Sequence, residues 1–258
     1  MPTYQTTRNK TNRTYIINRI AMKKHIPNTI TSMNLFSGSI AIVMAFEGAF
    51  IWVVFWVILA AIFDFFDGMA ARLLNAYSEI GKELDSLADV VSFGVAPSLA
   101  VFILLRDYIL FPESLSIIQP YVPYLAFIIA VFSALRLAKF NIDERQTSSF
   151  IGLPTPANAL FWISYVYGIH QISSENSMAL YLTLGLIFAL SLLMVSEIPM
   201  FSFKLKNMKV RGNEKPIILI ICAIVFVSLW GIAGLAWTIL TYIAISIVTA
   251  LMTKRAVK

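Results

Sequence analysis

The chain has 258 residues, of which 59% are hydrophobic and 13% are charged, and its mean hydropathy is +0.78. This composition excludes a soluble domain and is typical of a protein that crosses the membrane several times. The net charge of +6 gives no support for nucleic-acid binding beyond the charge itself, and the single cysteine, Cys222, excludes an intramolecular disulfide.

Apolar windows of about 20 residues predict an all-α fold with about eight transmembrane helices. No internal repeat and no long linker divides the chain, so we expect one transmembrane domain over residues 25–258. Residues 1–24 are rich in lysine and arginine and lack the apolar core of a signal peptide, so we expect a cytoplasmic segment that either orients the protein or binds anionic headgroups. The predicted helices span about 27–46, 48–74, 78–105, 121–141, 155–171, 178–199, 215–232 and 235–252.

Lysine and arginine are distributed unequally between the two sides of the predicted membrane. With a cytoplasmic N-terminus, 19 of the 20 basic residues lie on the cytoplasmic side and only Arg106 lies outside. This distribution predicts a multi-pass protein of the cytoplasmic membrane with both termini in the cytoplasm.

Four aspartates interrupt the apolar sequence between residues 64 and 89. A carboxylate inside a membrane is energetically costly, so such residues indicate a functional site. At 3.6 residues per turn they form one stripe on each of two consecutive predicted helices, together with small residues. The first stripe holds Asp64, Asp67, Gly68 and Ala71, and the second holds Gly81, Asp85 and Asp89. Two facing helices would place the four carboxylates around one cavity, which the topology puts in the cytoplasmic leaflet.

Neighbouring carboxylates repel one another unless a cation of high charge density lies between them. Ligation by oxygen alone suits Mg²⁺, Mn²⁺ or Ca²⁺. With Arg72 nearby and small residues that leave room, the expected guest is a phosphate ester such as a diphosphate. Two alternatives are acids that merely pair with Arg72 and Lys82, and a cation transporter, although the second half holds no inverted repeat of the acidic motif.

The order of these residues resembles the signature of the CDP-alcohol phosphatidyltransferase family. All eight signature positions match with the family's spacing: Asp64, Asp67, Gly68, Ala71, Arg72, Gly81, Asp85 and Asp89. The resemblance implies a six-helix catalytic core and a divalent metal, Mg²⁺ or Mn²⁺, in two ions. It also implies metal binding by Asp64, Asp67, Asp85 and Asp89, general-base catalysis by Asp89, and binding of CDP-diacylglycerol by Gly68, Ala71, Arg72 and Gly81.

Four further segments resemble the phosphatidylserine synthase branch of that family. They are PNTITSMNLFSG (27–38), SFGVAPS (92–98), ALRLAKFN (134–141) and FIGLPTPANA (150–159). The branch implies transfer of a phosphatidyl group from CDP-diacylglycerol to L-serine, which gives phosphatidylserine and CMP at the lipid surface. Glycerol phosphate or inositol phosphate as acceptor is the alternative, and a homodimer is left open.

Polar residues in these segments are candidates for substrate contacts. Asn28 and Thr31 share one face of the first predicted helix, where contact with the nucleotide and packing between helices are both open. Pro97 should bend the third helix. We expect Arg136 to aim at an anion in the cavity, whereas Lys139 would also suit a headgroup. The predicted acceptor-binding residues are Arg136, Lys139, Asn141 and Ser92.

Overall fold

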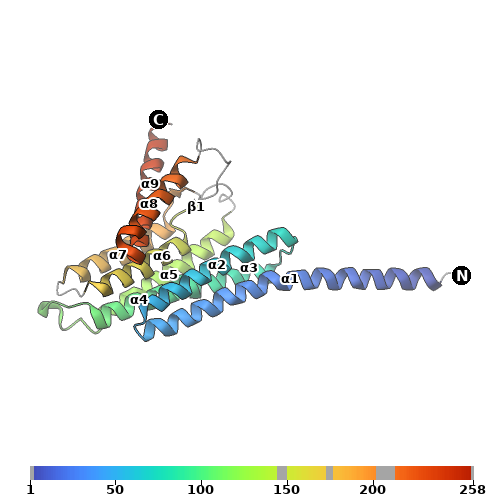
Figure 1. The fold of residues 1–258 in the computed structure, drawn as a ribbon, viewed down its shortest axis with the longest axis horizontal. Coiled ribbons are helices and arrows are strands. Elements are labelled where there is room, and N and C mark those ends of the chain that lie inside the picture. The colour runs from blue at the N-terminus through green and yellow to red at the C-terminus, as the bar shows by residue number, and fades with distance from the viewer. Residues whose placement is uncertain (1–2, 144–149, 173–176, 202–212, 257–258) are drawn as a thin grey trace.

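The structure is a computed structural model, and it describes residues 3–143, 150–172, 177–201 and 213–256. The prediction of an all-α membrane protein is confirmed, since helices make up nearly all of the described chain (Figure 1). The principal helices are α1 (Thr3–Phe46), α2 (Phe50–Leu74), α3 (Glu79–Asp89), α4 (Ala96–Ile103), α5 (Ile128–Ile142), α6 (Thr155–Gln171), α7 (Met178–Val195), α8 (Glu214–Trp230) and α9 (Gly234–Ala256).

Most predicted helix limits agree with the structure to within three residues, but three do not, one of them the end of the last helix at Ala256 rather than about 252. The first helix begins at Thr3 rather than near residue 27, so the basic segment and the first span form one continuous helix. Neither the polar composition of the segment nor Pro27 ends α1, which runs through both. The predicted helix over 178–199 ends at Val195, where a short extended segment begins.

Pro97 changes the helix in a more specific way than a simple bend. The third predicted helix is α-helical in α3, π-helical over Val90–Val95, and α-helical again in α4. The amide of Ala96 donates to the carbonyl of Val91, five residues earlier. Because proline has no N–H to continue the ladder, one extra residue per turn is accommodated just before it. This π-helical segment begins directly after Asp89, so it sets the direction in which the rest of the helix leaves the acidic stretch.

Two of the shortest elements connect distant parts of the chain. Strands β1 (Phe150–Ile151) and β2 (Pro199–Met200) pair antiparallel just before α6 and just after α7. Next to β2, the hydroxyl of Tyr242 in α9 donates to the carbonyl of Phe201 over 3.2 Å. Since α9 also packs on α6, the C-terminal helix pair α8–α9 is attached to the body at this point (Figure 1).

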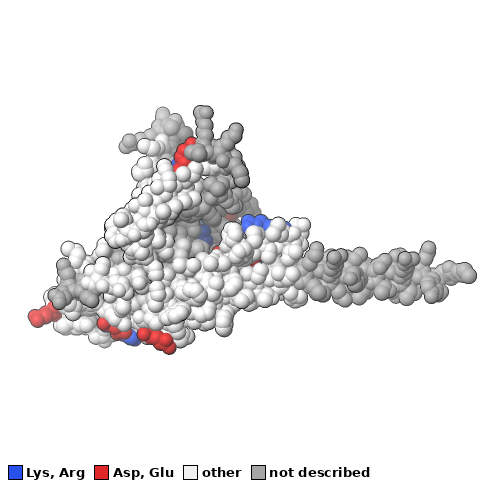
Figure 2. All heavy atoms as spheres, in the orientation of Figure 1, with Lys and Arg blue, Asp and Glu red and all other residues white. Residues whose placement is uncertain are grey.

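Six stretches of the described chain are long and apolar enough to cross a membrane: His25–Phe46, Phe50–Leu74, Glu79–Tyr108, Val122–Ile142, Met178–Val195 and Glu214–Met252. The last contains both α8 and α9, and α6 with 17 residues is not among them. A polytopic membrane protein is therefore confirmed, whereas the number of eight spans stays a prediction. On the face in Figure 2, charged side chains gather at the ends of the body and in a hollow beside the helix pair.

Candidate active site

Three of the four aspartates come together where α2 faces α3. Asp64 and Asp67 lie on α2, and Asp85 lies on α3. One carboxylate oxygen of each residue lies within 4.8 Å of those of the other two. Asp67 is buried, and the other two are partly buried. This is the arrangement that the two sequence stripes predict, and it concentrates negative charge in an apolar environment.

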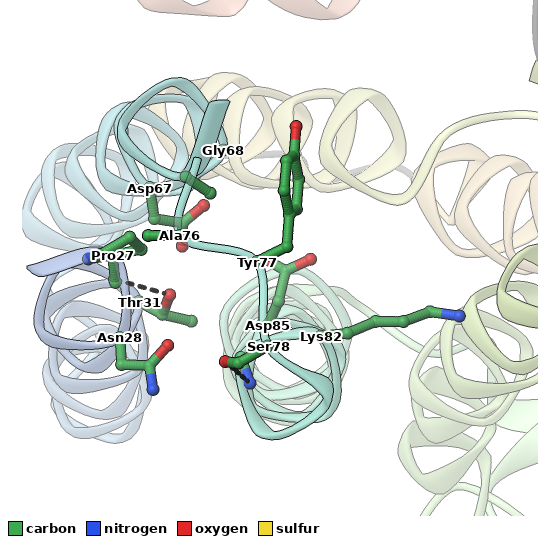
Figure 3. Close-up of a pocket in the computed structure, with 12 residues that line it drawn as sticks. Pro27, Asn28, Thr31, Asp67, Gly68, Ala76, Tyr77, Ser78, Lys82 and Asp85 are labelled. Carbon is green, nitrogen blue, oxygen red and sulfur yellow. Dashed lines mark hydrogen bonds between the residues drawn. The ribbon is translucent and has the colours of Figure 1, made fainter. Parts of the chain in front are cut away.

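A cavity of about 220 Å³ opens beside these carboxylates, between α1, α2 and the start of α3 (Figure 3). Asp67 and Asp85 reach it from opposite sides, and small residues form much of the wall. Five predicted CDP-diacylglycerol-binding residues line it: Asn28, Thr31, Gly68, Ala71 and Gly81. A Cβ atom added to Gly68 would have no heavy atom within 4 Å, so open space adjoins this glycine.

Ser78 fixes the entry of α3 into this cavity. Its backbone is extended, and its hydroxyl accepts a hydrogen bond from the amide of Gly81 over 3.0 Å, as an N-cap residue does. The added Cβ at Gly81 would lie 2.9 Å from Oδ1 of Asn28, so glycine also lets α3 approach α1 closely. The turn thus brings the predicted nucleotide residues of the first three helices to one wall.

Arg72 does not line the cavity in the described structure. It lies one residue beyond Ala71 on α2, and its side chain is exposed. A long arginine side chain can still extend toward a bound anion, but the structure gives this residue no contact with the carboxylates. Its predicted role in binding the diphosphate stays a prediction.

Asp89 lies one helical turn deeper than Asp85 and is 7% exposed. Its Oδ1 accepts a hydrogen bond of 3.3 Å from Nδ2 of Asn34 in α1. Ser92, predicted to bind the acceptor, is fully buried and donates instead to the backbone carbonyl of Asn34 over 3.1 Å. Ser92 therefore joins two helices at the site, and its hydroxyl proton is engaged by backbone.

Arg136 approaches the acidic cluster from α5. It is 7% exposed, its Nη1 donates to the hydroxyl of Thr155 over 3.2 Å, and its guanidinium lies 4.8 Å from the ring centre of Phe140. Its charge interacts with the carboxylates of Asp89 and Asp64. Arg136 is therefore a buried cation on the side of the acids away from the cavity lining, and its role toward an anion stays a prediction.

The other two predicted acceptor residues make contacts that tie helices together. Lys139 Nζ lies 2.5 Å from the carboxylate of Glu197 and 3.2 Å from the carbonyl of Val195. The amide of Asn141 donates to the hydroxyl of Ser86 over 2.8 Å. These contacts hold α5 against α3 and against the end of α7, so both residues shape the site's frame in this structure.

The residues present fit a divalent cation. Oδ2 of Asp67 and Oδ1 of Asp85 are buried and have no hydrogen-bond partner among the described residues. Leaving a buried polar atom unpaired costs about 1–3 kcal/mol, and more for a charged group. Carboxylate oxygens from two helices, close together and unpaired, are the donor set that Mg²⁺ or Mn²⁺ prefers.

Comparison with known proteins decides the family. A family model described as CDP-alcohol phosphatidyltransferase matches residues 24–200. The chain belongs to this family. The matched range holds the acidic cluster, the cavity and Arg136, so these features are those of a CDP-alcohol phosphatidyltransferase, and the cation-transporter alternative falls.

Several curated relatives carry a serine-related name. A CDP-diacylglycerol–serine O-phosphatidyltransferase of Helicobacter pylori (strain J99) is 35% identical over 79% of this chain and 80% of its own. The enzyme of that name from Bacillus subtilis is 37% identical over 70% of this chain and 92% of its own. An archaetidylserine synthase of Methanothermobacter thermautotrophicus is 31% identical over 67% of this chain and 68% of its own.

Two residues at the site were not among the sequence predictions. Asn34 is fully buried and contacts Asp89, and Thr155 is fully buried and contacts Arg136. The spacing of Asn34, three residues after Thr31 on the same helical face, was the available signal. Thr155 lies in the segment 150–159 that resembles the family, but nothing in the sequence paired it with Arg136, which lies 19 residues earlier on another helix.

Proposed function

We propose that this phosphatidyltransferase moves the phosphatidyl group of CDP-diacylglycerol to L-serine and releases CMP. The observation that carries the proposal is the group of three carboxylates, within 4.8 Å, beside a cavity walled by small residues. The serine acceptor is supported by the names of the relatives from Helicobacter and Bacillus, at 35% and 37% identity.

The donor would bind in the cavity with its diphosphate toward the aspartates. Asp64, Asp67 and Asp85 would hold Mg²⁺ or Mn²⁺, with Asp89 completing a second metal site. Bound divalent metal supplies charge neutralisation for the transferring phosphoryl group and for the departing CMP. Gly68, Ala71 and Gly81 give the nucleotide access to the helix backbones, while Asn28 and Thr31 offer it polar contacts.

The acceptor would bind deeper, near Asp89 and Arg136. Asp89 takes the proton from the serine hydroxyl. At the same time the hydroxyl oxygen of serine bonds to the phosphatidyl phosphorus, and the bond between that phosphorus and CMP breaks. Arg136 offers a planar fork that suits the serine carboxylate. Thr155 accepts one of its N–H groups and so fixes the guanidinium plane.

The site would face the cytoplasm, with acyl chains remaining in the lipid. This orientation is supported by the 19 basic residues on that side in the sequence map. Serine and CMP would then exchange with the cytosol. A homodimer is compatible with this arrangement but is not required by it.

Purified protein in detergent, supplied with CDP-diacylglycerol and Mn²⁺ or Mg²⁺, provides the test. L-serine should give CMP and phosphatidylserine, both identified by mass spectrometry. Glycerol 3-phosphate and inositol phosphate serve as matched acceptors. CMP release with one of these and not with serine would refute the serine assignment, while release with none would refute the transfer reaction.

A further inference from the structure

Asn34 holds an unusual position for a buried amide. Its side chain is fully buried on α1, and Nδ2 donates to Oδ1 of Asp89 while its own Oδ1 has no partner among the described residues. A carboxylate can only accept, so the amide nitrogen must face Asp89. The amide thus satisfies the carboxylate and leaves its own oxygen unpaired.

The backbone beneath this amide is fixed as well. The carbonyl of Asn34 accepts the hydroxyl of Ser92, which lies in the π-helical segment three residues after Asp89. One turn further along α1, a Cβ atom added to Gly38 would lie 2.2 Å from Oγ of Ser92 and 2.7 Å from its Cα. The backbones of the two helices are therefore in contact there. This contact fixes the position of Asn34 along α1 relative to Asp89.

We propose that Asn34 positions the Asp89 carboxylate for catalysis, with Oδ1 held by the amide so that the orientation of the carboxylate toward the acceptor is fixed. The proposal rests on the assignment of Asp89 as general base in the proposed function. A carboxylate on a helix can rotate about its terminal torsion, and a base must stay within hydrogen-bond reach of the proton it removes. One fixed oxygen removes that freedom without occupying the other.

The experiment compares Asn34→Ala with Ser37→Ala in the full-length protein. Ser37 is a matched control because it is also buried on α1, and its hydroxyl donates to the carbonyl of Met33 in the same helix. Asn34→Ala should lower kcat about 10- to 100-fold, as a small misplacement of a reacting group does. The KM for CDP-diacylglycerol should stay within about threefold, and Ser37→Ala should match the wild type.

Binding of Mn²⁺, followed by the loss of the free-ion electron paramagnetic resonance signal, gives a second readout. Asn34→Ala should bind Mn²⁺ at the three-carboxylate group within about threefold of the wild type, since Asn34 contacts no member of that group in the described structure. A kcat within about threefold of wild type would overturn the proposal. So would a parallel loss of Mn²⁺ and CDP-diacylglycerol affinity, which would assign Asn34 to the donor site.

If Asn34→Ala does not fold, Asn34→Ser takes its place, because a serine hydroxyl there is too short to reach Asp89; the same outcomes apply. Failure of the proposed function would show differently, as a wild-type protein that uses another alcohol. The variants are then compared with that alcohol, so the role of Asn34 is tested either way.

Discussion

Asp67 and Asp85 belong to different helices, yet their carboxylate oxygens lie within 4.8 Å of each other, each with one buried oxygen that has no partner among the described residues. Two carboxylates at this distance repel each other and destabilise the fold unless a cation lies between them. We therefore expect the metal-free protein to be the less stable form, because a divalent metal bound here would link α2 and α3.

Loss of one of these carboxylates should therefore remove metal binding and turnover together. We expect Mn²⁺ to raise the thermal midpoint of the wild type. Asp67→Asn should abolish this rise and lower kcat at least about 100-fold. Glu83→Gln, at an exposed position on α3, is the control and should change neither. Near-normal turnover of Asp67→Asn in chelator-treated protein would contradict the metal site.

Arg136 should act on the acceptor and not on the donor. Arg136→Ala should raise the KM for serine at least about tenfold with little change for CDP-diacylglycerol, and Arg136→Lys should restore little because lysine lacks the planar fork. Arg106→Ala is the control, since Arg106 pairs with Asp107 at the opposite end of the same helical bundle. An equal effect on both substrates would assign Arg136 to the diphosphate or to folding.

Gly68 tests the cavity by filling it. No heavy atom lies within 4 Å of a Cβ at this position, so the open space beside Gly68 should let Gly68→Val fold. The added side chain would occupy space that the donor needs, so the KM for CDP-diacylglycerol should rise at least about tenfold, a loss of about 1.4 kcal/mol in binding. An unchanged KM would place the nucleotide elsewhere.

Gly38 tests the contact between α1 and the π-helical segment. Gly38→Ala places a methyl group 2.7 Å from the Cα of Ser92, so backbone must move, at a cost of about 1–3 kcal/mol. The thermal midpoint in detergent should fall. Gly185→Ala in α7 is the control, since nothing lies within 4 Å there, and its midpoint should stay level or rise. Equal midpoints for the two variants would show that the contact is loose.

Membrane orientation can be checked with single cysteines on a Cys222→Ala background. Ser114→Cys and Glu79→Cys both lie at exposed positions, on opposite sides of the predicted membrane. An impermeant thiol reagent added to intact cells should modify the first and not the second. Modification of Glu79→Cys from outside would reverse the topology and move the site to the other leaflet.

Local patterns in the sequence were enough to predict most of the helices and the group of three carboxylates. Asp64, Asp67 and Asp85 recur with helical spacing inside apolar segments. Such spacing can be recognised within each helix separately, without knowing how the helices pack. The start of α1 could not be predicted in this way, because polar residues 3–24 show no boundary between helix and tail. Helical propensity alone is a weak guide without an apolar face.

Contacts between distant segments were beyond the same reasoning. The sequence pointed to Lys139 and Ser92 as substrate ligands, and the structure shows Lys139 paired with Glu197 and Ser92 bonded to the backbone of Asn34. Both partners lie more than 50 residues away along the chain, and pairings at that separation depend on how helices pack. The spacing of Asn34 placed it on the polar face of the first helix, but its contact with Asp89, 55 residues away, depends on the same packing.

The hydrogen bond from Tyr242 to the carbonyl of Phe201 has a consequence for biosynthesis. The family match ends at residue 200, but β2 lies against α9, and α6, which begins with the partner of Arg136, packs on α9 too. A nascent chain that has inserted only the first seven helices would hold every proposed metal ligand and still lack the support behind its acceptor pocket. The chain would then become active only after α9 has left the translocon. Before that, an incomplete chain could bind metal but could not turn over substrate.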